Sequence, residues 1–433
     1  MPTPASGLHS LSHLQMRVFA ITWIAYAGYY LCRKNLSVIM PLLQSDLGFT
    51  PVDLANVVLG YSAAYSAGQF LIARLSDRYG PRLVVTAGML GAAAATMACG
   101  MVSNVWILMA LQVVNGFCQA CGFSGLVKIL GAWFHPGVRG VVMGLWGTSY
   151  GLGASIATLI ATWSATGPFL VALGWRRACW IPALLLVAVA AVFWVIVHAD
   201  PRTTRGDKRH TPEPVPSNFS FFQHPPLIAI AGMYFCVKLI RYSLLFWLPT
   251  YMTNRLHYSP SDAGYASASF ELIGFGGMVA AGFASDRLAK GRRFPVSTVM
   301  LTLLSAALAL FPTMSAAGFW WNVSGIAMLG FLVMGPDSLM SAAAVQDLAP
   351  KEATARVAGI VNGFGSLGQV ASPYTVAWVV RFAGWDALFL GFIAVALLGA
   401  VIAGTQWRIA PRALEPELLE PLPCHPSVRA LSS

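Results

Sequence analysis

Long apolar stretches separated by short polar breaks run along almost the whole chain. A helix needs about 20 mainly apolar residues to cross the hydrocarbon of a bilayer. Stretches of that kind fall at 16–43, 53–74, 83–102, 106–130, 139–165, 178–198, 227–252, 262–284, 295–314, 318–346, 355–380 and 386–407. The pattern predicts an all-α membrane protein with twelve transmembrane helices.

The composition agrees with this pattern. The chain of 433 residues is 57% hydrophobic and 10% charged, with a mean hydropathy of +0.66, whereas a soluble protein carries about 25% charged residues. The sequence therefore indicates a multi-pass protein whose solvent is the lipid bilayer.

The longest polar interruption is HADPRTTRGDKRHTPEPVPSNFSFFQHPP, between the sixth and seventh predicted helices. A segment rich in proline and charge is typical of a linker. It divides the chain into an N-terminal six-helix half at 1–198, a cytoplasmic linker at 199–226, a C-terminal six-helix half at 227–407 and a cytoplasmic tail at 408–433.

The net charge of +11 reflects topology rather than nucleic acid binding. Most Lys and Arg residues fall in segments on one side of the membrane, and only Arg176, Arg177, Arg255 and Arg381 fall on the other. The positive-inside rule places both termini in the cytoplasm. The short termini and the lack of a targeting signal favour a bacterial inner membrane.

The two halves repeat each other at matched spacing. ARLSDRYGPR follows the second predicted helix and GFASDRLAKGRR follows the eighth, so that Asp77 and Asp286 lie 209 residues apart. Arg33 and Arg241, both inside predicted helices, lie 208 residues apart. A duplicated six-helix unit is typical of secondary transporters, whose binding site lies at the midplane between the repeats.

Charged residues inside the predicted helices point to an anion site. The cations are Arg33, Lys34, Lys128, Lys238 and Arg241, and the acids are Glu271 and Asp337. Each such charge costs about 2.5 to 3.5 kcal/mol near the centre of a bilayer on insertion scales. A surplus of cations therefore predicts a central cavity that attracts anions.

Arg33 and Arg241 are the candidate anion clamp, because a guanidinium can hold two oxygens of a phosphate or carboxylate at once. In the alternative interpretation, each arginine is neutralised by a neighbouring acid and only tightens the packing of the helices. Neither arginine, however, has an acid three or four residues away. Lys238 lies three residues before Arg241 and shares its helix face.

Two other charged residues have different predicted roles. Lys34 points roughly 100° away from Arg33 on a helix, which favours an interhelix partner or a charge on the cavity wall over a place in the clamp. Glu271 is expected to pair with Lys238 or Arg241 in the empty state.

The loops with Asp77 and Asp286 resemble the signature G-x-x-x-D-R-x-G-R-[KR] of the major facilitator superfamily, although the first copy has Ala73 and Pro81 at two signature positions. The resemblance covers the whole chain and implies two pseudo-symmetric six-helix bundles. It also implies a conformational latch at Asp77, Arg78, Asp286 and Arg287. Alternatively, these charges only set the topology.

A narrower resemblance is carried by AYAGYYLCRKNLSVIMPLL, IRYSLLFWLPTYM, GFLVMGP and GFGSLGQVASP. These stretches are similar to the organophosphate:phosphate antiporter family of glycerol-3-phosphate and hexose-phosphate transporters. The resemblance implies that Arg33 and Arg241 bind phosphate, that Tyr30 and Tyr65 line the pore, and that Glu271 is the acid of helix eight. The chain departs from the family at Gln69, Tyr150 and Phe246, where a lysine, a histidine and an acid are usual, and Lys238 is an added cation. We expect Gln69, Tyr150 and Lys238 to take part in substrate binding together with Arg33, Arg241, Tyr30, Tyr65 and Glu271.

The sequence thus predicts exchange of a phosphorylated organic anion for inorganic phosphate by alternating access, without an enzyme activity, a cofactor or a metal. No GxxxxGK[ST] phosphate loop is present, so ATP is not the direct energy source. Two alternatives stay open. One is proton-coupled transport of an organic anion or phosphonate, with Asp337 or Glu271 titrating, and the other is a sugar-phosphate sensor that does not transport. We expect a monomer.

Overall fold

The computed structural model describes residues 13–134, 136–197, 221–348 and 354–409. Within these ranges the chain is helical and contains no strand. Most of the predicted linker and most of the predicted tail lie outside the described residues, so their boundaries stay predictions.

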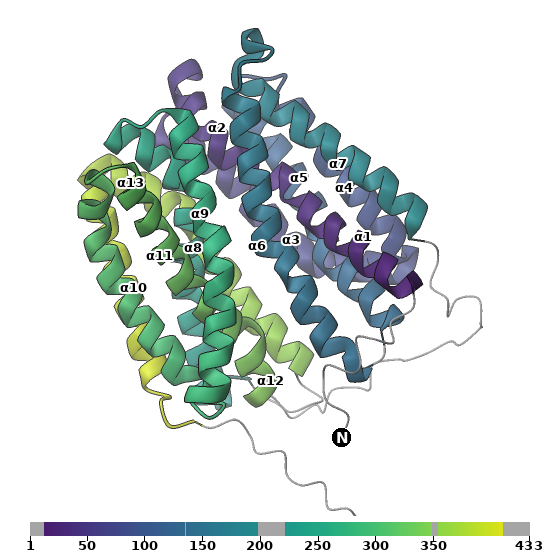
Figure 1. Cartoon of the computed structure of the whole chain (residues 1–433), viewed down its shortest axis with the longest axis vertical. Coiled ribbons are helices and arrows are strands. Elements are labelled where there is room, and N and C mark those ends of the chain that lie inside the picture. Colours follow the sequence, from purple (N-terminus) through teal and green to yellow (C-terminus); the bar gives the residue numbers. More distant parts are fainter. Residues whose placement is uncertain (1–12, 135, 198–220, 349–353, 410–433) are drawn as a thin grey trace, which may run out of the picture.

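The helices form two bundles side by side, with α1 to α7 in one and α8 to α13 in the other (Figure 1). The first bundle contains α1 (His13–Tyr29), α2 (Leu31–Leu47), α3 (Pro51–Tyr79), α4 (Pro81–Cys99), α5 (Val105–Trp133), α6 (Pro136–Thr166) and α7 (Arg177–Ile196), with a short 3-10 helix η2 (Val171–Arg176). The second begins with a 3-10 turn η4 (Phe221–Gln223) and contains α8 (Pro225–Leu256), α9 (Pro260–Phe283), a π-helical turn η5 (Ala284–Leu288), α10 (Arg293–Ala316), α11 (Phe319–Ser338), a second π-helical turn η6 (Leu339–Ala343), α12 (Ala344–Leu348) and α13 (Thr354–Gly404).

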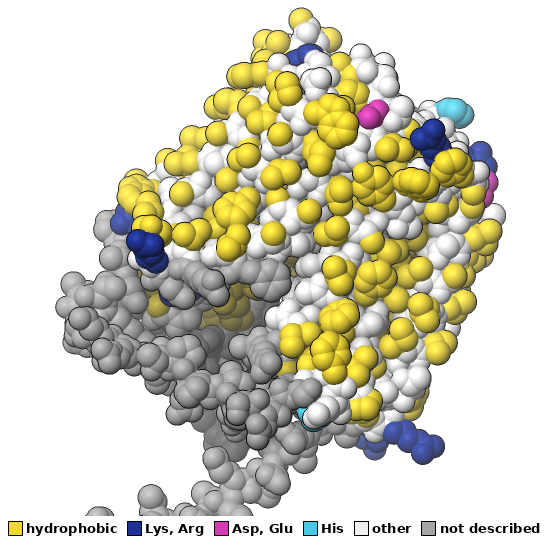
Figure 2. Space-filling view, turned by 180° about the vertical axis from the view of Figure 1, so that it is seen from behind, with side chains coloured by type: hydrophobic (Ala, Val, Ile, Leu, Met, Phe, Trp, Pro, Cys, Tyr) yellow, Lys and Arg dark blue, Asp and Glu magenta, His cyan; other side chains and the backbone are white. Residues whose placement is uncertain are grey.

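The described residues of the twelve predicted ranges lie almost entirely in helices. In the described part, eight helical segments are long and apolar enough to cross a membrane by length and composition. The last of them, at 357–404, covers two predicted spans. They are two helices within α13 that meet at a kink at Gly384, which has φ 81° and ψ 177°. On the face seen in Figure 2, hydrophobic side chains are spread over the whole described surface, and Lys and Arg side chains lie toward its ends.

The first predicted span, 16–43, was expected as one helix, and the structure corrects this. The helix is interrupted at Tyr30, where Tyr30 N donates to Ala27 O and Arg33 N donates to Tyr30 O, both at 3.1 Å. These bonds span three residues instead of four, so the backbone tightens for one turn. The tightening lies directly before Arg33.

Close backbone contact fixes α9 against α11. A Cβ added to Gly330 would lie 1.9 Å from Phe270 O, and one added to Gly277 would lie 2.0 Å from Phe331 O. Small residues let membrane helices approach this closely. The contact sets the spacing between two helices that each carry an intramembrane acid.

The two bundles are joined at one end of the molecule, where α2 and α8 end and α3 begins. Three hydrogen bonds connect them there or toward the middle: Asn254 Nδ2 to Gln44 Oε1 at 2.9 Å, Tyr374 Oη to Asn56 Oδ1 at 2.5 Å, and Ser155 Oγ to Ala268 O at 3.3 Å. Toward the middle, Tyr150 Oη also donates to Met334 Sδ at 4.0 Å, and Lys34 of α2 contacts Leu245 O of α8 and Glu271 of α9. The structure is therefore closed at this end.

Candidate functional site

The structure gathers the intramembrane charges at the interface between the bundles. Arg33 and Lys34 lie in the first turn of α2, and Lys238 and Arg241 lie in the middle of α8. The acids Glu271 and Asp337 come from α9 and the end of α11. All six side chains are buried or nearly so. We call these six residues the central cluster.

Asp337 holds two of the cations of α8. Its Oδ2 accepts a hydrogen bond from Arg241 Nη1 at 2.8 Å, and its Oδ1 lies 3.4 Å from Lys238 Nζ. Lys238 and Arg241 lie on one helix face, as predicted from their spacing. Arg241 is thus neutralised by an acid from another helix. The sequence prediction considered only acids three or four residues from Arg241 and therefore missed this pair.

Lys34 and Glu271 form an ion pair between the bundles, with Lys34 Nζ 3.6 Å from Glu271 Oε2. Lys34 Nζ also donates to Leu245 O of α8 at 3.4 Å. The expectation that Glu271 pairs with Lys238 or Arg241 is therefore wrong, because Asp337 occupies both. Of the roles predicted for Lys34, the structure shows the interhelix partner.

Arg33 has a different environment from the other three cations. Its guanidinium carbon lies 4.7 Å from the ring centroids of Tyr30 and Tyr65 and 6.0 Å from that of Tyr61. Its Nη1 donates to Tyr30 Oη at 3.4 Å, and its Nε has no hydrogen-bond partner. In the described part of the chain no carboxylate pairs with it, so its cation is held by aromatic rings.

Two tyrosine rings connect the arginines of the two bundles. Tyr30 and Tyr150 meet edge to face with their centroids 5.6 Å apart. Arg33 lies over the first ring and Arg241, at 4.5 Å from the centroid, lies over the second. Tyr150 therefore belongs to the cluster's surroundings, in contact with Arg241.

The central cluster carries a surplus of positive charge. Four cations against two carboxylates leave two unbalanced positive charges in a buried site. Buried charge of this kind is costly unless an anion or water compensates for it. The arrangement can therefore bind a small anion, above all one with two negative charges.

The other predicted residues have weaker links to the cluster. Tyr65 contacts Arg33, whereas Gln69 lies one turn further along α3 with its Nε2 unpartnered. At the predicted latch, Asp286 Oδ1 pairs with Arg293 Nη1 at 2.5 Å rather than with the adjacent Arg287. The side chain of Asp77 lies outside the described residues, and Arg78 lies over the Tyr79 ring at 5.2 Å.

Four residues of these networks were missed in the sequence. The ring centroids of Tyr234 and Tyr242 lie 5.0 and 5.3 Å from Lys238 Nζ. Each tyrosine stands four residues from Lys238, one before it and one after it, and this spacing was a signal that could have found them. Arg293 and Asp347, paired at 2.7 Å, extend the predicted latch. They are far apart in the sequence, and no local pattern connects them.

No group of three or more His, Cys, Asp or Glu side chains in the described ranges is placed to hold a metal ion.

Known structures share this fold. The chain is similar to a solved structure titled "Crystal Structure of A Bacterial Homolog to Human Lysosomal Transporter, Spinster, in Inward-facing And Occupied Conformation", with a TM-score of 0.71 and 16% identity, over 92% of this chain and 96% of that one. At this identity the similarity shows the fold alone.

Relatives of known name match over nearly the full length. The glycerol-3-phosphate transporter of Bacillus subtilis (strain 168) is 27% identical, over 92% of this chain and 94% of that protein. Sugar phosphate exchanger 3 of Homo sapiens is 29% identical, over 90% and 92%. These relatives are transport proteins, which supports at the level of the family the prediction that the chain is not an enzyme.

The family described as "Major Facilitator Superfamily" matches residues 22–373. The chain therefore belongs to the Major Facilitator Superfamily of multi-pass membrane transporters, and its relatives agree with the organophosphate:phosphate antiporter family predicted from its helices.

Proposed function

We propose that this protein exchanges a phosphorylated organic anion, such as a sugar phosphate or glycerol phosphate, for inorganic phosphate by alternating access. The observation that carries the proposal is the pair of arginines, one from each bundle, joined through the Tyr30 and Tyr150 rings in a cluster with two unbalanced positive charges. The names of the relatives support a phosphate-bearing substrate.

The charge of the substrate class matches the charge of the site. A phosphate monoester carries about −1.5 to −2 charges at pH 7 and three strong acceptor oxygens. Arg33 offers its guanidinium without a competing carboxylate among the described residues, and Arg241 can exchange Asp337 for a phosphate oxygen. Bound phosphate then neutralises the cluster from both bundles at once.

The two bundles and their contacts support alternating access. The proposed halves, 1–198 and 227–407, rock about the central cluster, and a substrate drives the change only if it binds the closing state more tightly. With both termini in the cytoplasm of a bacterial inner membrane, the joined end at Gln44 and Asn254 faces outward. In this proposal the opposite end opens to the cytoplasm for substrate entry, and a monomer suffices for the cycle.

The test uses purified protein in liposomes loaded with phosphate and given radiolabelled phosphate outside. We expect uptake that requires internal phosphate and is inhibited by glycerol-3-phosphate or glucose-6-phosphate. Correctly folded protein that exchanges no phosphate would overturn the proposal and leave a sensor as the better interpretation.

Proton-coupled uptake is the second candidate, and it rests on Asp337. Protonation of this carboxylate would free Arg241 and Lys238 together. The same liposomes distinguish the two functions: a proton gradient imposed on phosphate-free liposomes drives uptake only in the proton-coupled case.

A further inference from the structure

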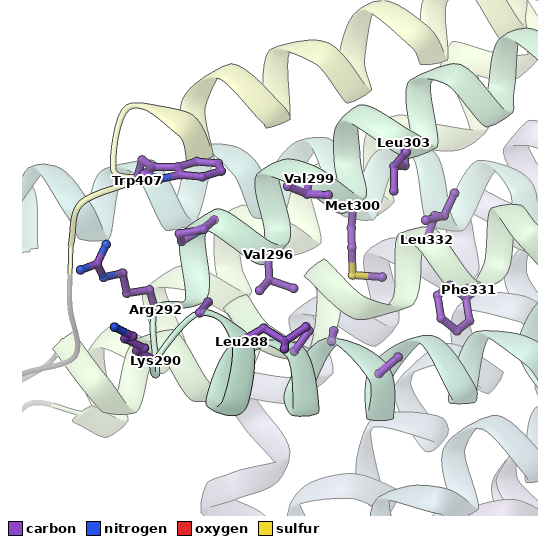
Figure 3. Close-up of a pocket in the computed structure, with 15 residues that line it drawn as sticks. Leu288, Lys290, Arg292, Val296, Val299, Met300, Leu303, Phe331, Leu332 and Trp407 are labelled. Atoms are coloured by element: carbon purple, nitrogen blue, oxygen red, sulfur yellow. The ribbon is translucent and has the colours of Figure 1, made fainter.

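A hollow of about 620 Å³ opens on the flank of the second bundle, away from the central cluster (Figure 3). It lies between α9 with η5, α10 and α11, and none of its lining residues belongs to the central cluster. Its volume falls within the range of about 300 to 1,000 Å³ that is common for ligand pockets.

The two ends of the hollow differ in chemistry. Lys290, Arg292 and Trp407 lie at one end, and Leu303, Phe331 and Leu332 lie at the other (Figure 3). Between them the walls are aliphatic. The hollow therefore has a cationic mouth and an apolar interior, which is the shape of a site for an amphiphile with an anionic head.

The cations at the mouth are available to an outside anion. Lys290 and Arg292 are exposed, and the structure describes no ion pair for either. The nearby acids Asp286 and Asp347 are both held by Arg293, at 2.5 and 2.7 Å. The local charge at the mouth is thus positive.

Local backbone structure produces the hollow and its mouth. The π-helical turn η5 follows α9, and the chain then reverses through Lys290 and Gly291, which have φ of 53° and 81°. Alanines line the α9 side, where larger side chains would fill the space: Ala280, Ala281, Ala284 and Ala289. The turn brings Lys290 to the rim, and the alanines leave the interior empty.

The depth of the hollow matches one leaflet of a bilayer. Arg293 begins α10, and Leu303 lies ten residues further along it, or about 15 Å at 1.5 Å per residue. The hydrocarbon core of a bilayer is about 30 Å thick. Trp407 follows the end of α13, and tryptophan, lysine and arginine are typical of the headgroup level.

We infer that this hollow binds one anionic phospholipid, with its phosphate held by Lys290 and Arg292 beside the Trp407 ring and an acyl chain along the groove toward Leu303. A second copy of this chain would place an apolar helix against the same groove but would leave both cations without an anion. A phospholipid satisfies both ends, and basic pockets between membrane helices bind anionic headgroups.

The first test is native mass spectrometry of the full chain in detergent, titrated with phosphatidylglycerol or phosphatidylcholine. We expect one tightly bound phosphatidylglycerol and weaker phosphatidylcholine. The double variant Lys290→Gln/Arg292→Gln should weaken phosphatidylglycerol binding roughly thirtyfold, since each cation near the membrane surface contributes a factor of about five. The matched control is Arg17→Gln/Arg381→Gln, which removes two exposed cations elsewhere and should leave the tight site intact.

The second test locates the lipid in the unchanged protein. Phosphatidylglycerol with a photoreactive group in its acyl chain should label peptides that contain Val296, Leu303 or Phe331. Equal binding of the two lipids, equal loss in the control variant, or labelling confined to other helices would overturn the inference. Crosslinks between two copies of the chain through this groove would also overturn it.

Discussion

Asp337 Oδ2 accepts a hydrogen bond from Arg241 Nη1 at 2.8 Å, so the second bundle supplies its own anion to its half of the proposed clamp. Arg33, in the first bundle, contacts aromatic rings instead. The two arginines are therefore unequal in this state: one is ready for a substrate and the other must first release a carboxylate. The same carboxylate also pairs with Lys238.

Replacing Asp337 by Asn should change affinity and turnover in opposite directions. Without the competing carboxylate, the cluster gains one positive charge and phosphate should bind more tightly, by roughly tenfold for about 1.4 kcal/mol. Release should become slower, because no internal anion takes the place of the substrate. Phosphate binding by calorimetry and exchange in liposomes would measure both. Weaker binding in Asp337→Asn would contradict a competing role, and exchange that loses its pH dependence would favour proton coupling.

Replacing Arg33 or Arg241 by Lys should reduce phosphate binding by about ten- to a hundredfold, because a charged hydrogen bond contributes about 1.5 to 3 kcal/mol and an ammonium cannot bind two oxygens in one plane. Arg255→Lys is the matched control, since Arg255 is exposed and pairs with Asp386 at the joined end. Full phosphate affinity in both Arg33→Lys and Arg241→Lys would reject the clamp.

The sequence predicted the helical spans and the arginine pair because both leave a pattern along the chain. Apolar stretches reveal the spans, and the repeat at 208 residues relates Arg33 to Arg241. The pairing of the charges left no such signal, because Glu271 and Asp337 meet cations from other helices. The break at Tyr30 was missed for a similar reason, since its one turn of tightened hydrogen bonds interrupts no hydrophobic pattern.

The ion pair between Lys34 and Glu271 predicts a strong dependence of stability on both partners. Lys34→Met leaves the Glu271 carboxylate buried without its cation, which should cost about 3 to 5 kcal/mol and lower the melting temperature. The double variant Lys34→Met/Glu271→Met removes both charges and should recover most of the loss. Thermal unfolding in detergent for the two single variants and the double variant gives the comparison. Additive losses would show that the two residues act independently.

Close contact at Gly264 predicts control over the joined end. A Cβ at Gly264 of α9 would lie 2.2 Å from Thr162 Oγ1 of α6, in the other bundle. Gly264→Ala should therefore push the bundles apart there and raise the population of the state open at this end. Spin labels on Asp46→Cys and Arg255→Cys, two exposed positions at this end, leave the hydrogen bond between Gln44 and Asn254 in place. They should show longer distances by pulsed electron resonance in Gly264→Ala than in the protein with glycine there.

The matched control for this prediction is Gly276→Ala on the same helix, where an added Cβ would meet only the Phe331 ring at 3.9 Å. This variant should leave the distance distribution unchanged. Adding Thr162→Ala to Gly264→Ala removes the two atoms nearest to the new methyl group and should shift the distances back toward those of the unmodified protein. If Gly264→Ala leaves the distances at the joined end unchanged, then α6 and α9 do not determine closure there, and the hydrogen bonds of Gln44 and Asn56 become the stronger candidates.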